Sequence, residues 1–403
     1  MALLSNIILA LTIIGTLYYV LSVLALAHHF RRSHKKIRRQ ISAHEITHAH
    51  QPKSGCSLYT EGSLLPRISV LKPVSGLDFD ALRNFLSYLE QDYPDYEVLF
   101  GVLDSNDPAV KVVADAICNF ENASLHVGSR IEGSNNKVRI LDNLMSHASG
   151  EIIVVTDADT RVPANFLSNI VRSFVDDQVG AVTCLYRGFQ AKTIADALEG
   201  LHMTCVFAPG VAAANALRGI DFGLGAAIAI RKNALNALRG FKSVVDYLAD
   251  DFQLCHRIVG AGYVAELSDV VVDIVLSGEP LRQVVERQLR WSRTTRVSRP
   301  WGHLGLLLSF GFVHAVGFLA VSSFSQLGWL TLATVTTIRL ATAWYGARVC
   351  LDDREFNRRI YLLPICDLFS FGIWIAGYFS NTVVWRERKL KLLRDGRMIE
   401  LKK

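Results

Sequence analysis

An uncharged apolar run over residues 2–27 constrains the fold more than any other feature of the sequence. A helix of that length spans the hydrocarbon core of a bilayer. A secretory signal peptide places its basic residues before the apolar run, whereas here they follow it. They are Arg31, Arg32, Lys35, Lys36, Arg38 and Arg39. Because basic residues concentrate on the cytoplasmic side of membrane helices, we predict an uncleaved anchor whose C-terminal side faces the cytoplasm.

Composition also indicates membrane segments beside a folded domain. The 403 residues have a mean hydropathy of +0.26, which is too high for soluble domains alone. The net charge of +6 is modest and the basic residues flank apolar runs, a pattern typical of membrane topology rather than of nucleic-acid binding. Seven cysteines without a C-x-x-C pair argue against a disulfide framework or a zinc site, and favour a reducing compartment.

A second apolar region near the C-terminus predicts further membrane segments. Its runs cover Leu304–Val321, Leu327–Ala347 and Ile360–Val384. If all three cross the membrane together with the anchor, the basic tail lies outside, against the positive-inside tendency. Asp367 also lies within the last run, where an ionisable residue is costly. The last run is therefore re-entrant or interfacial, or the tendency fails here, and both interpretations stay open.

Between these regions, short strands and helices alternate from about Ile68 to Asp273. The strand-like segments are Ile68–Leu71, Glu97–Val102, Ile152–Val155 and Gly180–Cys184. The helix-like segments are Asp78–Glu90, Asp107–Phe120, Lys137–His147 and Ala164–Val175. Such alternation predicts β-α-β units and a mostly parallel sheet, so we expect an α/β domain.

The pattern divides the chain into five parts. They are an N-terminal transmembrane anchor (1–30), a basic and polar linker (31–65), a cytoplasmic domain (66–300), C-terminal transmembrane segments (301–385) and a basic tail (386–403). Within the cytoplasmic domain, Pro209 and Gly210 interrupt an apolar stretch over residues 201–217. The stretch is too short to predict a membrane span, and an interfacial helix and a buried core helix both stay open.

Two carboxylates follow the most apolar strand of this domain. Ile152–Val155 is a run typical of a strand buried on both faces, and Asp157 and Asp159 come directly after it. Pro163 then begins the next helix pattern at a favoured first-turn position. Two carboxylates at this spacing can ligate a divalent cation that also holds a diphosphate. They are also common helix caps, so the D-x-D motif alone does not decide between a metal site and a cap.

Other polar motifs lie at the ends of strands and the starts of helices. They are Lys72-Pro73, Asp104, Asn136-Lys137, Asp250-Asp251 and Arg287-Gln-Leu-Arg290-Trp291. Each alone is explained by helix capping or by a solvated helix face. Their order fits a site at the carboxyl edge of a parallel sheet, where open α/β sheets bind ligands. No G-x-G-x-x-G follows the first strand, which argues against a dehydrogenase.

Together these motifs resemble a known family. The matching text is Leu71-Lys-Pro73-Val-Ser-Gly76, Gln91-Asp-Tyr-Pro94-Asp-Tyr-Glu-Val98, Asp104-Ser-Asn-Asp107-Pro108, Asn136-Lys137, Asp157-Ala-Asp159, Asp250-Asp251 and Arg290-Trp291. The segment from Ile68 to Arg299 resembles membrane-anchored glycosyltransferases of the family 2/21 type, close to the bacterial hopanoid glycosyltransferases and the ceramide glucosyltransferases. The resemblance implies a GT-A type, Rossmann-like nucleotide-diphospho-sugar transferase domain. Val182–Gly188 and Asp221–Ala226 are more similar to the hopanoid branch.

The resemblance also implies roles for the residues that bind the donor. Lys72 and Pro73 are expected to border the nucleotide, and Asp104 to face the uridine. Lys137 is expected to lie near the base and the diphosphate. A UDP-sugar is the implied donor.

The remaining roles concern the metal and the chemistry. Asp157 and Asp159 match the D-x-D that holds Mg²⁺ or Mn²⁺ on the sugar nucleotide, so Asp157 is also a donor residue. Asp251 matches the catalytic base of inverting enzymes. Arg290 and Trp291 match the end of a Q-x-x-R-W motif beside the diphosphate and the acceptor.

The chain departs from the family pattern at two places. Arg287 stands four residues before Trp291, where the motif has glutamine, and Gln288 lies one position away. The ceramide enzymes resemble R-x-x-R-W there, so only roles specific to glutamine are affected. Those enzymes also have a degenerate D-x-D, whereas this chain retains Asp157 and Asp159, which favours an ordinary metal site.

The function implied by the resemblance is inverting transfer of a hexose or N-acetylhexosamine to a membrane-lipid hydroxyl. A hopanoid polyol is the expected acceptor, in a bacterial inner membrane with the catalytic domain in the cytoplasm. A ceramide glucosyltransferase is the alternative, and a processive polysaccharide synthase or a non-catalytic membrane scaffold are more distant ones. The sequence has no motif that specifies the sugar or the lipid.

Overall fold

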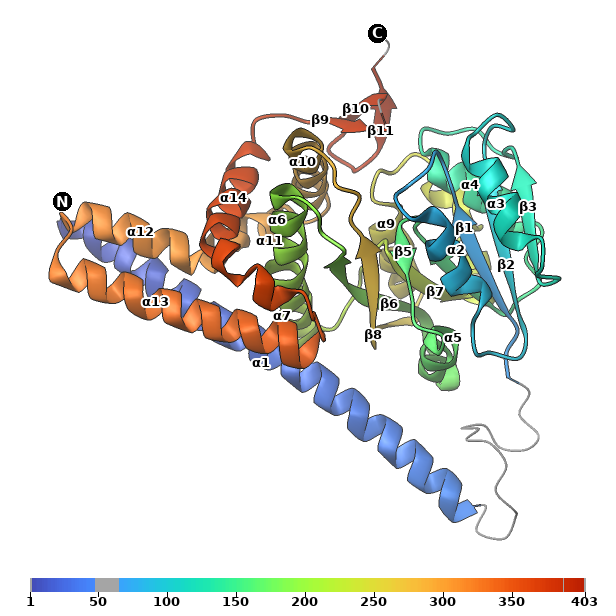
Figure 1. Ribbon diagram of the computed structural model, residues 1–403, viewed down its shortest axis with the longest axis horizontal. Helices are drawn as coiled ribbons and strands as arrows, with labels where there is room; N and C mark the ends of the chain where they lie inside the picture. The colour runs from blue at the N-terminus through green and yellow to red at the C-terminus, as the bar shows by residue number, and fades with distance from the viewer. Residues whose placement is uncertain (1, 48–64, 387, 402–403) are drawn as a thin grey trace.

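The computed structural model describes residues 2–47, 65–386 and 388–401. They form an α/β domain, a group of apolar helices on one side of it, and a small C-terminal sheet (Figure 1). The helix α1 (Ala2–Thr47) extends well beyond the expected anchor and into the segment that was expected to be a linker. The rest of that linker, residues 48–64, lies outside the described residues.

The central sheet has eight strands in the order β3-β2-β1-β4-β7-β6-β8-β5. Its strands are β1 (Ile68–Pro73), β2 (Tyr96–Val102), β3 (Ala123–Val127), β4 (Ile152–Thr156), β5 (Thr160–Arg161), β6 (Val179–Phe189), β7 (Ala227–Arg231) and β8 (Val264–Val275). The strands β3, β2, β1 and β4 are mutually parallel, and so are β6 and β8. The exceptions are β7, antiparallel to β4 and β6, and the short edge strand β5.

Helices cover both faces of this sheet. Alternate residues along a strand therefore pack into two hydrophobic cores, one on each face. In β1, Val70 packs on one face with residues of α2 (Ala81–Leu89) and α3 (Ala109–Ile117). The next residue, Leu71, packs on the other face with α4 (Asn136–Met145) and α9 (Asp250–Gly260). A strand buried on both faces needs a continuous apolar sequence, as β4 has. The predicted α/β fold with a mostly parallel sheet is thereby confirmed.

The apolar helices α1, α12 (Gly311–Val321) and α13 (Gln326–Trp344) pack side by side. Figure 1 shows the turn between α12 and α13 beside the N-terminal end of α1. Gly15 and Gly311 allow this packing, since a Cβ atom on Gly15 would lie 2.4 Å from the Cα atom of Gly311. Close approach through small residues is typical of membrane helices. By length and composition, Leu3–Ser33 qualifies as a span, and Pro300–Ser309 with Gly311–Val321 qualifies as one bent span.

The interrupted stretch around Pro209 forms a continuous helix. It consists of α6 (Ile194–His202), a π-helical turn over Met203–Phe207, and α7 (Ala208–Arg218). Its length and composition also suit a membrane span, although 67% of its most apolar window is buried inside the protein. The helix is therefore longer than the sequence suggested, and its burial agrees with the buried core helix of the two open interpretations.

A buried ion pair accompanies the π-helical turn. Pro209 has no N–H to donate to the carbonyl of Cys205, four residues earlier. That carbonyl accepts a hydrogen bond of 3.1 Å from Arg339 instead. The same guanidinium binds both carboxylate oxygens of Asp367, at 2.8 and 2.7 Å. This pairing explains how an aspartate is tolerated in the last apolar run.

The last apolar run does not form one span. The helix α14 (Leu363–Ala376) ends well before Val384, and Thr382–Trp385 forms strand β9. The expected basic tail forms β10 (Arg388–Leu392) and β11 (Met398–Glu400), antiparallel to one another and to β9. This sheet packs on the α/β domain, where the amide of Met398 donates to the carbonyl of Asp246 at 2.8 Å. The described part of the tail is therefore attached to the α/β domain.

We predict that the ion pair of Arg339 and Asp367 is a major determinant of stability. Their side chains are only 6% and 4% exposed. Asp367→Asn leaves a buried guanidinium without its counter-charge, and we expect a loss of about 3–5 kcal/mol in the free energy of unfolding. Thermal unfolding of the detergent-purified protein measures it.

The control is Asp352→Asn, the same substitution in an exposed pair with Arg354, which should be nearly neutral. The double variant Arg339→Met with Asp367→Leu should lose less than Asp367→Asn alone. If Asp367→Asn unfolds at the wild-type temperature, the pair has no such role.

Candidate active site

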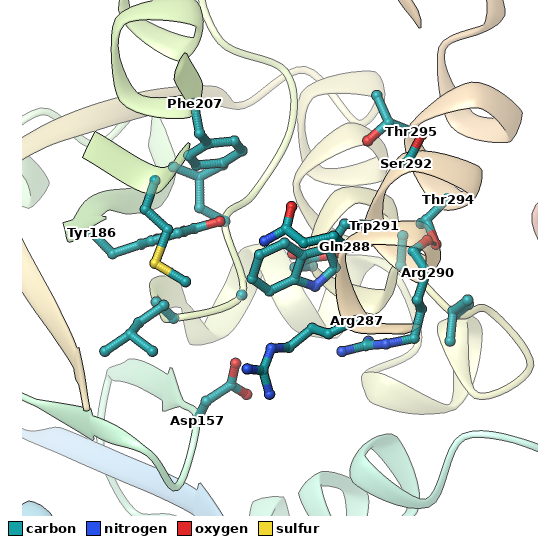
Figure 2. A pocket seen from close by; sticks show the side chains of 18 of the residues that line it. Asp157, Tyr186, Phe207, Arg287, Gln288, Arg290, Trp291, Ser292, Thr294 and Thr295 are labelled. Atoms are coloured by element: carbon teal, nitrogen blue, oxygen red, sulfur yellow. Dashed lines mark hydrogen bonds between the residues drawn. The ribbon is translucent and has the colours of Figure 1, made fainter. Parts of the chain in front are cut away.

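A cavity of about 1220 Å³ lies where the α/β domain meets the apolar helices. One part of its wall is polar and comes from loops at the carboxyl ends of β1 and β4 and from the start of α9. The opposite part comes from α6, α7, α14 and the helix α10 (Leu281–Ser298). Figure 2 shows side chains of α10, including Arg287, Arg290 and Trp291, extending into the cavity that Asp157 enters from the sheet.

Asp157 and Asp159 line the cavity directly after β4, as the sequence predicts. Lys137 donates a hydrogen bond of 2.6 Å to Asp157, and its Nζ atom lies 3.7 Å from Asp250. Burial opposes the charge of Lys137, but these carboxylates more than offset it and raise its pKa. Lys137 is thus held at the sheet edge as a cation.

The start of α4 is fixed so that Lys137 reaches this position. Asn135 caps α4, accepting a hydrogen bond from the amide of Val138 at 3.2 Å. Its side-chain amide donates to the carbonyl of Tyr247 at 2.8 Å and to Asp250 at 3.2 Å. One asparagine therefore joins the starts of α4 and α9, which explains why the two motifs converge.

The acidic groups at the end of β4 are crowded. Burial, together with the charges of Asp157 and Asp78, raises the pKa of Asp159 to about 7. A divalent cation would relieve this repulsion, and carboxylate oxygens are suitable ligands for Mg²⁺ or Mn²⁺. The described residues contain no group of three or more potential protein ligands. The two aspartates therefore fit a cation that takes its other ligands from water and a bound diphosphate, as Mg²⁺ commonly does.

Pro73 lines the cavity and Lys72 does not, and the expected place of Lys72 beside the nucleotide stays a prediction. Its ammonium group is fully buried and donates to the carbonyl of Asp157 at 2.7 Å. It also lies 3.9 Å from the ring centroid of Tyr88. Burial lowers the pKa of Lys72 to about 7. Its contact identifies Lys72 as a support for the D-x-D loop.

Asp104 is exposed at the end of β2 and is not among the residues that line the cavity. It accepts hydrogen bonds from the amide and side chain of Asn106, at 2.9 and 3.1 Å. Its role toward a uridine remains a prediction. The neighbouring Asp107 was not assigned a role, yet it accepts from the amide of Gly76 through both oxygens, at 3.0 and 2.9 Å. It thereby ties the loop after β1 to the loop after β2.

Asp251 lies in the first turn of α9 and lines the same cavity. A Cβ atom on Gly225 would lie 3.1 Å from an oxygen of Asp251 and 3.5 Å from one of Asp157. Gly225 thus leaves open the space between the expected base and the expected metal ligand. Burial, followed by the charge of Asp250, raises the pKa of Asp251 to about 7. A carboxyl group with this pKa can accept a proton near neutral pH.

On α10, Arg287 is held by two carboxylates. It donates to both oxygens of the fully buried Glu199 on α6, at 2.7 and 2.5 Å, and forms an ion pair of 2.7 Å with Glu279. Gln288 also donates to Glu199, at 3.4 Å. The charge of Arg287, which stands where the motif has glutamine, is therefore balanced by carboxylates of the same chain. Glu199 could not be identified from the sequence, because a single acid within an apolar helix belongs to no motif.

Arg290 differs from Arg287 because no carboxylate in the described part of the chain binds it. Its guanidinium lies 5.5 Å from the ring centroid of Trp385 on β9. Burial, followed by the nearby charge of Arg287, lowers the pKa of Arg290 to about 10, so it remains protonated at neutral pH. Trp291 lines the cavity beside it and packs against the main core. Arg290 and Trp291 thus line one cavity together with Asp157, Asp159, Lys137, Asp251 and Pro73, and their expected roles stay predictions.

The end of the cavity toward the membrane-type helices is apolar. Its lining residues include Tyr18, Met203, Val206, Phe207, Phe310 and Trp374. The rings of Tyr186 and Phe207 stack with their centroids 4.9 Å apart, between the sheet and this apolar part. The cavity therefore joins a charged compartment to an apolar one.

Comparison with known proteins agrees with the motifs. The profile of glycosyl transferase family 21 matches residues 17–398. Ceramide glucosyltransferase 1 of Caenorhabditis elegans is 24% identical over 361 residues, covering 83% of this chain and 73% of that protein. Ceramide glucosyltransferase 3 of Caenorhabditis elegans is 23% identical, covering 84% and 75%. The structure of mannosyltransferase PcManGT from Pyrobaculum calidifontis, in complex with GDP-Man and Mn²⁺, is similar with a TM-score of 0.47, 19% identity, and coverage of 92% of this chain and 99% of that one.

We predict that Asp159 is needed for cation binding. Asp159→Asn removes one of two carboxylate ligands, so Mn²⁺ affinity in the presence of UDP should fall by at least about tenfold. Electron paramagnetic resonance of free Mn²⁺ measures it. Asp115→Asn, the same change at an exposed position on α3, is the control. Unchanged Mn²⁺ binding by the Asp159 variant would contradict the assignment.

Proposed function

This chain belongs to glycosyl transferase family 21, and from that premise we propose that it transfers a hexose or an N-acetylhexosamine from a UDP-sugar to a membrane-lipid hydroxyl. The family membership confirms the resemblance found in the sequence and establishes the chain as a glycosyltransferase. The donor, the acceptor and the inversion of the anomeric carbon are parts of the proposal.

One observation carries the proposal: a single cavity contains a carboxylate-rich end and an apolar end. The first is lined by Asp157, Asp159 and Asp251, and the second by residues such as Phe207 and Phe310. A sugar nucleotide is highly charged, whereas a lipid hydroxyl stays attached to an apolar chain. An enzyme that joins them needs both environments within reach of one reacting centre.

In the proposed mechanism, Asp251 acts as the base. A lipid hydroxyl is a weak nucleophile, so a carboxylate aligned with it must accept its proton as the new glycosidic bond forms. The raised pKa of Asp251 suits this role. A single displacement at the anomeric carbon, with UDP as the leaving group, inverts the configuration.

The diphosphate gains negative charge as it leaves, and the chain supplies cations to offset it. Arg290, which no described carboxylate binds, is available to the diphosphate, and Lys137 lies at the D-x-D edge. A divalent cation held by Asp157 and Asp159 would supply further charge stabilisation when bound. Lys72 keeps the D-x-D loop in place through its bond to the carbonyl of Asp157.

The membrane arrangement follows from the packing of the apolar helices. We place α1, α12 and α13 across the bilayer, with α14 at its surface and the catalytic domain and C-terminal sheet on one side. The basic residues of α1 that come after its apolar run favour the cytoplasm for that side, and for a bacterial cell the membrane is the inner one. The cavity, which residues of α7 and α10 line, then lies beside the lipid headgroups.

Two acceptors are supported by different observations. Val182–Gly188 and Asp221–Ala226 favour a hopanoid polyol, whereas the relatives from Caenorhabditis elegans carry the name ceramide glucosyltransferase. Both acceptors have an apolar body with a hydroxyl group, so either suits the cavity. A processive polysaccharide synthase is disfavoured, because the described chain offers few helices with which to build a translocation channel. A scaffold without catalysis is disfavoured because the acids and Arg290 meet in one cavity.

We predict that Asp251→Asn abolishes transfer while UDP-sugar binding survives. The amide retains the shape of the side chain but cannot accept the proton of the acceptor. Transfer is measured with radiolabelled UDP-sugar and membrane lipids, and donor binding by isothermal titration calorimetry.

Wild-type transfer should also fall as the pH falls through about 7, because protonation of Asp251 removes the base. A bound divalent cation favours the ionised form of Asp251, so it moves the pH at which transfer is half-maximal to a lower value. Loss of donor binding in Asp251→Asn would mean that Asp251 holds the donor and that the base lies elsewhere.

A further inference from the structure

The C-terminal sheet is attached to the loops that carry the donor-side residues. Arg386, at the end of β9 with a positive φ of 43°, binds the carbonyl of Ser75 and lies 3.7 Å from Asp78 in the loop after β1. Arg388 donates to the carbonyl of Ser134, just before α4, at 3.2 Å. The β9–β10 hairpin therefore bridges two loops at the edge of the sheet where the D-x-D lies.

A second set of contacts fixes the other side of the hairpin. Its apolar residues pack against Leu248, immediately before α9, and Arg290 lies over the ring of Trp385. Arg293 of α10 donates to the carbonyl of Thr382 at 2.5 Å. The hairpin is thus held by the strand-end loops and by α10, the elements that also provide the candidate catalytic residues.

The hairpin also forms part of the cavity wall. Val384, Trp385, Arg386, Arg388 and Lys389 all line the cavity. Lys389 lies opposite Val384 in the β9–β10 register and is exposed. In the described part of the chain, its side chain has no hydrogen-bond or ion-pair partner, whereas Arg388 is paired with Glu400 at 2.7 Å.

Charge explains why an unpaired cation is needed here. The cavity wall contains the carboxylates of Asp78, Asp157, Asp159, Asp250 and Asp251. The cations Lys137 and Arg287 are already bound by carboxylates. A donor with a diphosphate would meet strong repulsion unless further positive charge faced it. Arg290 and Lys389 are cavity residues without a described carboxylate partner.

We infer that the β9–β10 hairpin completes the donor pocket and that Lys389 contacts the diphosphate of the nucleotide donor. Arg386 positions the hairpin on the loop after β1, and Trp385 positions Arg290. The inference rests on the proposed function, because it presumes a donor with a diphosphate. The hairpin follows the C-terminal apolar helices in the sequence, whereas the other expected donor-binding residues precede them.

The test compares two lysines of the same strand. Lys391 lies two residues beyond Lys389 on β10, is also exposed, and does not line the cavity. In the full-length protein with Mn²⁺, Lys389→Gln should weaken UDP binding roughly tenfold or more, as expected for loss of a hydrogen bond to a charged group. Lys391→Gln should bind UDP like the wild type, and Lys389→Arg should recover most of the affinity.

Kinetics distinguish this role from a structural one. Lys389→Gln should raise the KM for the UDP-sugar and leave the KM for the lipid acceptor unchanged. Equal UDP affinity in Lys389→Gln and wild type would overturn the inference and leave the proposed function intact. Equal weakening by Lys389→Gln and Lys391→Gln would also overturn it, because a general charge effect would then explain the result. A wild-type protein that binds no UDP would overturn the proposed function itself.

Discussion

The ion pair between Arg287 and Glu199 determines where the two environments of this protein meet. Glu199 is fully buried in α6, and a buried carboxylate is tolerated only when its charge and lone pairs are satisfied. Arg287 and Gln288 satisfy it from α10. This contact fixes α10 between the apolar helix and the edge of the sheet, so that Arg290 and Trp291 face the carboxylates after β4 and at α9.

Other arginines at and after the C-terminal half of α10 also attach this helix to neighbouring elements. Arg293 binds the carbonyl of Thr382, and Arg296 binds the carbonyl of Tyr378 at 3.2 Å. Arg299 forms an ion pair with Asp221, beyond α7. In this way one helix joins the α/β domain, the apolar helices and the C-terminal sheet, and the cavity lies where they meet. Among the apolar helices, Arg339 pairs with Asp367 and also donates a hydrogen bond to the carbonyl of Cys205, which Pro209 cannot bind.

Much of the α/β domain could be predicted from the sequence, because its strands are buried on both faces. The expected Ile68–Leu71 and Ile152–Val155 lie within β1 and β4. The strands β3, β7 and β8 were not predicted, since Ala123–Val127 is only partly buried and polar residues interrupt the apolar sequence of Val264–Val275. The antiparallel direction of β7 depends on long-range pairing, which local patterns do not encode.

The candidate site could also be predicted only in part from the sequence. Motifs at strand ends placed Asp157, Asp159, Lys137 and Asp251 in one cavity, because the edge of a parallel sheet collects such residues. The burial of Lys72 behind the D-x-D loop, in contrast, cannot be predicted from a strand-end pattern. The sequence also gave no sign that a tail rich in lysine and arginine forms a sheet and lines the cavity. Its charge entered the prediction only as a topology signal, whereas Leu390 and Met398 pack with Val383 of β9 against Leu248 of the α/β domain.

The central claim is that one cavity brings a sugar nucleotide to a membrane lipid. The most direct test is mass spectrometry of lipids after incubating the purified full-length protein, in lipid nanodiscs with Mn²⁺, with UDP-sugars and either a hopanoid polyol or a ceramide. We expect one of these lipids to gain the mass of a hexose or an N-acetylhexosamine. Sugar released only as free sugar or as a water-soluble polymer, with no glycosylated lipid, would contradict it.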